Sequence, residues 1–68
     1  MKTAELTKGT YFKTTTSNDV YEVREIEEIA VKCANITTDK YVHLFLNVEV
    51  AQVLTDEEKE AVNDFYGI

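Results

Sequence analysis

The sequence predicts a mainly β domain: a small, strongly bent antiparallel sheet of four to five strands, followed by one C-terminal α-helix. Three observations predict it. Between Tyr41 and Val50, apolar residues occupy every second position, which is the period of a strand. The run Thr10–Thr16, rich in Thr, Tyr and Phe, has the composition of an earlier strand and ends in turn residues. After Leu54, the chain has the start and stop signals of a helix.

The composition describes one small folded domain covering residues 1–68. Hydrophobic residues make up 44% and charged residues 29%, as in ordinary globular domains. A core of this size supplies a net stability of only about 3 to 5 kcal/mol, so we expect a partner or a second copy to help. The single cysteine, Cys33, excludes an intramolecular disulfide and favours a reducing compartment such as the cytoplasm. No apolar run has the roughly 20 residues of a membrane span, and the start MKTAELTKGT lacks the apolar segment of a signal peptide.

The first eight residues show no clear period, and we expect residues 1–8 to form a loosely held arm before a β meander over residues 10–54. The first hairpin of the meander is predicted to turn at Ser17 and Asn18. A shift of one residue would scatter its cross-strand pairs, which supports the register. The expected pairs are Thr16 with Asp19, Phe12 with Val23, Thr14 with Tyr21, Lys13 with Glu22, and Tyr11 with Arg24.

The second strand of this hairpin cannot continue straight. If it did, Glu25 and Glu27 would enter the core, where charged carboxylates are costly. We therefore expect a bulge or bend between Arg24 and Glu28, a device that strongly curved sheets use.

The second hairpin joins Ile29–Ile36 to Tyr41–Val50 through a turn at residues 37–40. Pairing Ile36 with Tyr41 separates an aliphatic core face from a mixed outer face. The expected core pairs are Cys33 with Leu44, Val31 with Leu46, and Ile29 with Val48; the expected outer pairs are Ala34 with His43, Lys32 with Phe45, and Ala30 with Asn47. Past Val50 the alternation breaks at Ala51 and Gln52, which indicates a kink into a short last strand.

A helix is predicted over residues 55–66. Thr55 and Glu58 have the spacing of a capping box, and Gly67 is placed to end the helix. Four residues at helical spacing form a narrow apolar stripe: Ala61, Val62, Phe65 and Tyr66. A helix of about three turns is not stable alone, so we expect it to pack on the sheet.

This strand pattern is similar to that of SH3-like barrels, in which meandering strands enclose one core and a short helix closes one end. The similarity implies a small barrel. The acidic aromatic stretch of peptide-binding SH3 domains is absent, and so are the glycines and prolines of their loops and groove: the chain has two glycines and no proline. The similarity therefore implies no particular function.

The residues that could support catalysis or metal binding do not form a known set. His43 and Cys33 are predicted on opposite faces of one sheet, so they cannot form a thiol–imidazole pair, and Cys33 is expected to be a small buried hydrophobe. The acidic cluster of Glu25, Glu27 and Glu28 lacks the glycine and spacing of a calcium loop. One histidine and one cysteine fall short of a zinc site, and neither glycine lies in a phosphate loop. We expect no enzymatic activity, no cofactor and no metal.

One surface is a candidate for binding. Tyr41, His43 and Phe45 lie on the outer strand face, which Tyr11 and Arg24 extend. We expect the helix to cover this face; the alternatives are contact with another protein and stacking of single-stranded bases. The helix adds a second set of candidate residues, the carboxylates of Glu57, Glu58, Glu60 and Asp64.

The net charge of −6 bears on the function. It disfavours nucleic acid as a partner, because phosphate backbones are bound chiefly through clustered Lys and Arg. The sequence favours a small acidic protein-interaction module that inhibits or docks on a larger, basic partner, as small nucleic-acid-mimicking proteins do. Short acidic chains of this kind occur among the accessory proteins of phages and mobile elements. One alternative is a structural subunit or homodimer without a ligand of its own. The other is single-stranded nucleic-acid binding through the aromatic face; no membrane association is expected.

Overall fold

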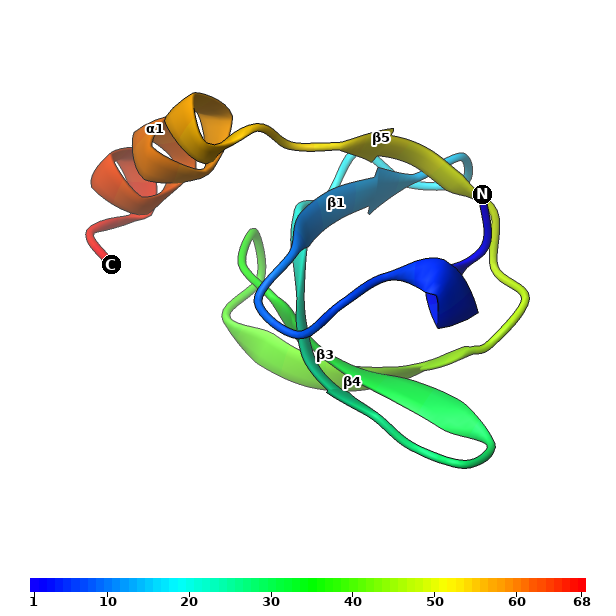
Figure 1. Cartoon of the computed structure of the whole chain (residues 1–68). Helices are drawn as coiled ribbons and strands as arrows, with labels where there is room; N and C mark the ends of the chain where they lie inside the picture. The colour runs from blue at the N-terminus through cyan, green and yellow to red at the C-terminus, as the bar shows by residue number, and fades with distance from the viewer.

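The computed structural model describes residues 1–68 and consists of one curved antiparallel sheet followed by one helix (Figure 1). The strands are β1 (Tyr11–Thr14), β2 (Tyr21–Ile26), β3 (Ala30–Asn35), β4 (Lys40–Phe45) and β5 (Val50–Val53). A 3-10 helix, η1 (Thr3–Glu5), precedes them, and α1 (Asp56–Tyr66) follows. The sheet order is β4-β3-β2-β1-β5, so β4 and β5 are its two edges and the sheet is open. The predicted mainly β fold with a C-terminal helix is confirmed.

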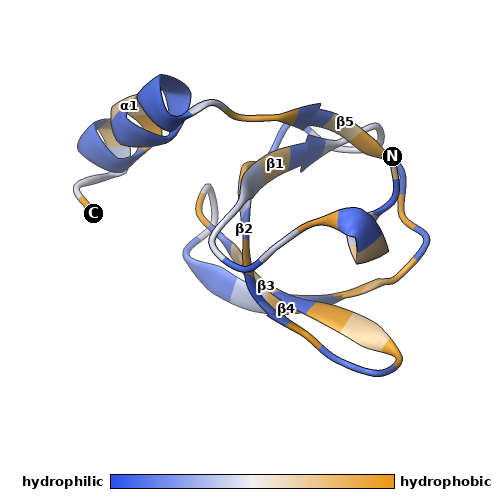
Figure 2. Cartoon of the chain, viewed as in Figure 1, coloured by the Kyte–Doolittle hydropathy of each residue, from blue (hydrophilic) through white to orange (hydrophobic).

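The core lies inside the curve of the sheet. Its buried apolar residues are Leu6, Phe12, Val23, Val31 and Cys33. Along the strands, hydrophobic and hydrophilic residues alternate (Figure 2), which gives the sheet an apolar inner face. The ring of Phe12 stacks on that of Tyr21 with centroids 5.5 Å apart, and this contact ties β1 to β2 within the core.

Both hairpins have a register that differs from the expected one by two residues. Phe12 lies opposite Tyr21, not Val23, and Cys33 lies opposite Val42, not Leu44. The expected pairs of both hairpins are therefore wrong. Because side chains alternate with a period of two, a shift of two residues leaves each side chain on its predicted face. The predicted division into an inner and an outer face is therefore correct, although the predicted register is not.

The bulge expected between Arg24 and Glu28 is confirmed at the start of that interval. The β2–β3 register shifts between Val23 and Glu25, leaving Arg24 without a partner in the ladder. As a result Glu25 lies opposite Lys32, outside the core, while Ile26 lies opposite Val31. The extra residue thus keeps a carboxylate out of the apolar interior.

The alternating run from Tyr41 to Val50 is not one strand. β4 ends at Phe45, the chain turns, and β5 begins at Val50, where it pairs with β1. Ile29, expected in the core, lies in the turn between β2 and β3 and is 82% exposed. The burial pattern still alternates through the turn, with Leu46 and Val48 half-buried. The alternation between half-buried and exposed side chains therefore continues beyond the end of β4.

The first residues do not form a loose arm. The N–H of Thr3 donates to the carbonyl of Val48 (3.0 Å), and that of Ala4 donates to Leu46 (2.9 Å). Thr3 is fully buried, and Leu6 belongs to the core. The segment that shows no period in the sequence is therefore an integral part of the fold.

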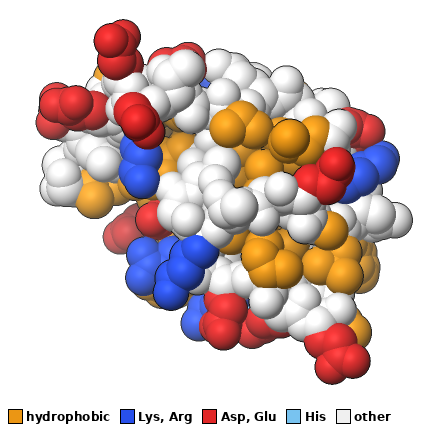
Figure 3. Space-filling view, viewed as in Figure 1, with side chains coloured by type: hydrophobic (Ala, Val, Ile, Leu, Met, Phe, Trp, Pro, Cys, Tyr) orange, Lys and Arg blue, Asp and Glu red, His pale blue; other side chains and the backbone are white.

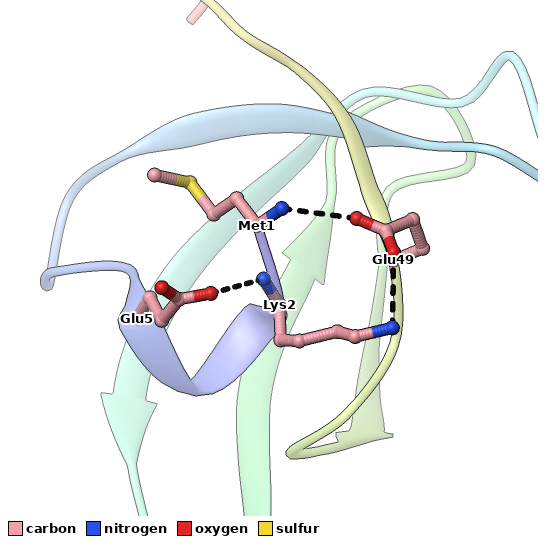
Figure 4. Close-up of polar contacts among 4 residues, drawn as sticks. All are labelled: Met1, Lys2, Glu5 and Glu49. Carbon is pink, nitrogen blue, oxygen red and sulfur yellow. Dashed lines mark hydrogen bonds and ion pairs between the residues drawn. The ribbon is translucent and has the colours of Figure 1, made fainter.

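A cluster of charges also holds the arm (Figure 4). The amino group of Met1 and Nζ of Lys2 contact the two carboxylate oxygens of Glu49, at 3.0 and 2.9 Å. These two cations lower the pKa of Glu49 below its ordinary value, with the hydrogen bond from Lys2 as the largest cause. The N–H of Lys2 in turn donates to the carboxylate of Glu5.

Candidate functional site

Helix α1 begins and ends as predicted. Oγ1 of Thr55 accepts the N–H of Glu58 (3.2 Å), and Oε1 of Glu58 accepts the N–H of Thr55 (2.9 Å), which completes the capping box. The hydrogen bond from the Thr55 backbone lowers the pKa of Glu58 below its ordinary value. Gly67 ends the helix in the left-handed region, and its N–H donates to the carbonyls of Asn63 and Asp64.

Two side chains of α1 attach the helix to the sheet. The hydroxyl of Tyr11 donates to Oδ1 of Asn63 (2.6 Å). Nζ of Lys59 donates to the carbonyl of Gly9 (3.0 Å) and lies 4.9 Å from the centroid of the Tyr11 ring. Tyr11 is therefore 3% exposed, and burial raises the pKa of its hydroxyl. At Tyr11, α1 therefore covers the outer face as expected, and Tyr11 is not open to a partner.

The rest of α1 projects from one end of the sheet (Figure 1). The helix has no buried residue, and Phe65 is 78% exposed. The rings of Phe65 and its neighbour Tyr66 are in a T-shaped arrangement, with centroids 4.9 Å apart. The expected packing of the apolar stripe over Tyr41, His43 and Phe45 is therefore wrong. Of the apolar stripe, Val62 is half-buried, whereas Ala61, Phe65 and Tyr66 are exposed to solvent.

A hollow of about 390 Å³ opens beside the end of α1. The loop from Ile36 to Asp39, between β3 and β4, lines one side of it, and Tyr66, Gly67 and Ile68 line the other. The exposed apolar side chains of Tyr66 and Ile68 therefore stand next to a concave surface. Sequence reasoning missed this hollow, because nothing local relates residues 36–39 to residues 66–68.

The charges of α1 are almost all negative and all carboxylates are exposed: Asp56, Glu57, Glu58, Glu60 and Asp64. Acidic side chains gather at the end of the molecule that carries the helix (Figure 3). Glu58 is engaged in the cap and with Gln52 (3.1 Å), which leaves Glu57, Glu60 and Asp64 spaced along one side of the helix. The one cation, Lys59, points to the sheet. What α1 offers to solvent is acidic and apolar.

A second exposed surface lies on β4. Tyr41 is 66% exposed and Phe45 is 75% exposed, on the outer face of an edge strand. Between them, Nε2 of His43 lies 3.3 Å from a carboxylate oxygen of Glu27. Nζ of Lys32 lies 5.5 Å from the centroid of the Tyr41 ring. The structure thus brings together the three predicted residues of β4 and adds two charged neighbours.

The remaining predicted residue, Arg24, lies apart from this surface. It belongs to β2, two strands from β4 in the sheet order, and its guanidinium pairs with Glu22 at 3.3 Å. The predicted set of Tyr11, Arg24 and the β4 aromatics is therefore not one continuous platform.

The thiol and the imidazole lie on opposite faces, as predicted. Cys33 is fully buried, its Sγ donates to the carbonyl of Val31 (3.7 Å), and burial raises the pKa of the thiol to about 11. His43 faces solvent. No group of three or more His, Cys, Asp or Glu side chains is arranged to hold a metal ion. No helix has the length and apolar character needed to cross a membrane.

Comparisons of the chain with protein-family models, with curated proteins and with solved structures found no match.

Proposed function

We propose that the protein is a small, non-enzymatic interaction module that presents α1 to a larger, basic partner. The observation that carries the proposal is the exposure of the helix. Isolated helices shorter than about 12 to 15 residues are marginal in water, and α1 has 11 residues, none of them buried. A partner that buries Phe65 and Tyr66 supplies the packing that the sheet does not.

The charges around these aromatic side chains define the chemistry of the partner. Because Lys59 is engaged with Gly9 and Tyr11, a partner meets the carboxylates of Glu57, Glu60 and Asp64. An apolar groove rimmed by Lys or Arg complements such a helix. The proposed role is therefore to dock in a basic groove and, by occupying it, to inhibit the partner, as small nucleic-acid-mimicking proteins do. We propose that the chain is an accessory protein of a phage or mobile element. We place this activity in the cytoplasm, where a single thiol stays reduced.

The test uses capture of a partner from an extract of the producing cells, comparing variants at two salt concentrations. Phe65→Ala and the triple variant Glu57→Gln/Glu60→Gln/Asp64→Asn are compared with wild type. Ile29→Ala is the matched control, because Ile29 is equally exposed but lies in the β2–β3 turn. We expect wild type and control to retain the same protein and both α1 variants to lose it.

The salt dependence of binding distinguishes the contribution of the carboxylates from that of the apolar side chains. Raising the salt concentration from about 50 to 300 mM should weaken wild-type binding at least about tenfold, because exposed charges are screened. The triple variant should lose most of that dependence. Salt-independent binding by wild type, or equal losses with Ile29→Ala and Phe65→Ala, would contradict the docking of α1 in a basic groove.

A second candidate is a structural subunit or homodimer. Exposure of Tyr41 and Phe45 on an edge strand favours it. Binding of single-stranded nucleic acid through the same aromatic residues has less support, because Glu27 lies beside His43 and the net charge is −6. Unchanged tyrosine fluorescence on adding an oligonucleotide at low salt would dismiss it.

We further propose to describe the curved sheet as an incompletely closed SH3-like barrel. Support comes from the strand order and from the arm, which bridges toward both edges. Ala4 bonds to Leu46 just after β4, and Lys2 forms an isolated bridge with Glu49 just before β5. An experimental structure that showed β4 and β5 far apart, with solvent between them, would dismiss the barrel.

A further inference from the structure

The types of side chain along β4 follow the same order in both directions. From Tyr41 to Phe45 they are aromatic, aliphatic, imidazole, aliphatic and aromatic. His43 is the centre of this pattern, with Val42 and Leu44 beside it. An interface between two identical copies related by a two-fold axis must be self-complementary, and a strand of this kind meets that condition when it pairs with itself.

The backbone of β4 leaves hydrogen-bonding groups at the free edge of the sheet. The carbonyl of Phe45 accepts the hydroxyl of Thr3, which belongs to the arm and not to β3. In an antiparallel ladder, the N–H and C=O of alternate residues point to the same side. Those of His43 and Tyr41 therefore point to the free edge as well, while Val42 and Leu44 bond toward β3.

We propose that two copies of the chain associate by antiparallel pairing of their β4 strands about a two-fold axis at His43. In this register Tyr41 of each copy lies opposite Phe45 of the other. On the inner face Val42 of each copy lies opposite Leu44 of the other. The two sheets become one, and the half-buried aliphatic side chains of β4 continue the core across the axis.

Other registers of the same strands fit less well. A shift by one residue places the exposed Tyr41 and Phe45 opposite the inward Val42 and Leu44. A two-fold axis at Val42 places Lys40 opposite Leu44. Only the axis at His43 matches aromatic with aromatic and aliphatic with aliphatic from Tyr41 to Phe45; Lys40 then lies opposite Leu46, beyond the end of β4. This agreement points to a second copy as the occupant of the edge.

The two edges of the sheet differ in how open they are to pairing. β4 has six residues, a regular ladder with β3, and no Asp, Glu, Lys or Arg between Tyr41 and Phe45. β5 has four residues, its ladder with β1 shifts register between Lys13 and Thr14, and Met1 accepts the N–H of Val50 beside it. The arm also touches the edge of β4, where the hydroxyl of Thr3 donates to the carbonyl of Phe45, but it forms no backbone hydrogen bond with Tyr41 or His43. Short, irregular or covered edges resist pairing, so β4 is the more open of the two edges.

The dimer should be weak, because one strand pair buries less surface than a stable interface needs. We expect a dissociation constant of about 10 to 100 µM. Sedimentation equilibrium up to about 1 mM protein measures it. A monomer throughout that range overturns the proposal, and so do species that grow beyond a dimer, because only two-fold pairing closes.

His43→Pro tests the backbone pairing. Proline removes the N–H that faces the free edge and no bond to β3, a position that tolerates it. We expect at least a tenfold weaker dimer with an unchanged sheet by circular dichroism. Ile29→Ala, an exposed position outside the strand, should dimerise as wild type does. Persistent dimerisation of a folded His43→Pro variant overturns the proposal.

Cross-linking tests the register without relying on the proline variant. Tyr41→Cys and Phe45→Cys are oxidised separately and as a mixture, since Cα atoms of a hydrogen-bonded pair, about 5.5 Å apart, suit a disulfide. The buried Cys33 does not compete. We expect the mixture to cross-link at least about ten times more than either variant alone. Equal cross-linking overturns the register. Phe65→Ala should leave dimerisation unchanged, so failure of the proposed function and failure of this dimer are distinguishable.

Discussion

Tyr11 joins the helix to the sheet with both parts of its side chain. Its ring lies under the ammonium of Lys59, and its hydroxyl donates to Asn63. Tyr11→Phe keeps the ring and removes the hydrogen bond, so we expect a loss of about 0.5 to 1.5 kcal/mol in the stability of the helix attachment. Hydrogen exchange of the α1 amides measures it. Tyr41→Phe is the control, because that hydroxyl is exposed, and an equal effect there would contradict the role of Tyr11.

The thiol of Cys33 makes the stability of the fold depend on alkaline pH. Its pKa is raised to about 11 in the folded chain by burial, whereas the unfolded thiol ionises near 8.5. The neutral thiol therefore contributes stability in full below about pH 8.5, and that contribution falls as the pH rises toward 11. We expect a loss of about 2 kcal/mol over this range. Urea unfolding at several pH values measures it, and a Cys33→Ala variant should not show this part of the loss.

Single residues could be predicted from the sequence where the signal is local or compositional. The burial of Cys33 follows from its aliphatic neighbours at every second position, and the cap of α1 follows from Thr55 and Glu58, three residues apart. The burial of Tyr11 did not follow, because its partner Asn63 is 52 residues away. Long-range side-chain contacts leave no periodic trace in the chain.

At the scale of elements, alternation determines the face of a strand but not its partner. Phe12 and Cys33 lie on the predicted face, yet each is paired two residues away from the expected position. The loops set the register. The N–H of Val20 donates to Oγ1 of Thr37, and the N–H of Ile36 donates to the carbonyl of Val20. These contacts between two loops cannot be read from either hairpin alone.

The cap of α1 can be weakened without touching the sheet. Thr55→Ala removes the oxygen that accepts the N–H of Glu58 and should cost the helix about 1 kcal/mol. Because no residue of α1 is buried, we expect helical ellipticity to fall while the sheet melts within about 0.5 kcal/mol of wild type. Thr15→Ala, an exposed loop substitution, should change neither signal. Cooperative loss of the sheet in Thr55→Ala would contradict the loose attachment of α1.

The same cap should respond to acid. The pKa of Glu58 is lowered in the folded chain, so its carboxylate supports the helix above the ordinary pKa of glutamate. That support is lost as the pH falls through the lowered value. We expect α1 to lose helicity below about pH 4.5, measured by circular dichroism. Glu58→Gln should show a smaller acid transition than wild type, and an identical transition would contradict the role of the carboxylate.

At the scale of the whole molecule, the arm is as important as any strand. Leu6 belongs to a core of five buried apolar residues. Leu6→Ala should cost about 2 to 4 kcal/mol, which is most of the stability of a domain of this size. We expect Leu6→Ala to be largely unfolded at 25 °C by urea titration. Leu54→Ala, in the half-buried linker before α1, should cost less, and a stable Leu6→Ala variant would contradict the importance of the arm.

The overall architecture could be predicted because its signals are strong: alternating strands, a bulge required by Glu25, and a capped helix. The candidate surfaces were predicted in part. Tyr41, His43 and Phe45 do share the outer face of β4, but the helix expected to cover them projects elsewhere. The sequence composition does not predict which way a helix points after a short linker. That orientation depends on a few contacts, such as that of Lys59 with Gly9.

The pairing of the arm with the turn before β5 affects how the chain folds as it is made. Thr3 finds its hydrogen-bond partner in Val48, and Met1 finds its own in Val50. During synthesis, the residues of the arm therefore remain unpaired until nearly fifty more residues have been added. Closing such a distant contact slows folding. Leu6 stays exposed throughout this interval, so a nascent chain that stalls before β5 should be a preferred client of chaperones and proteases.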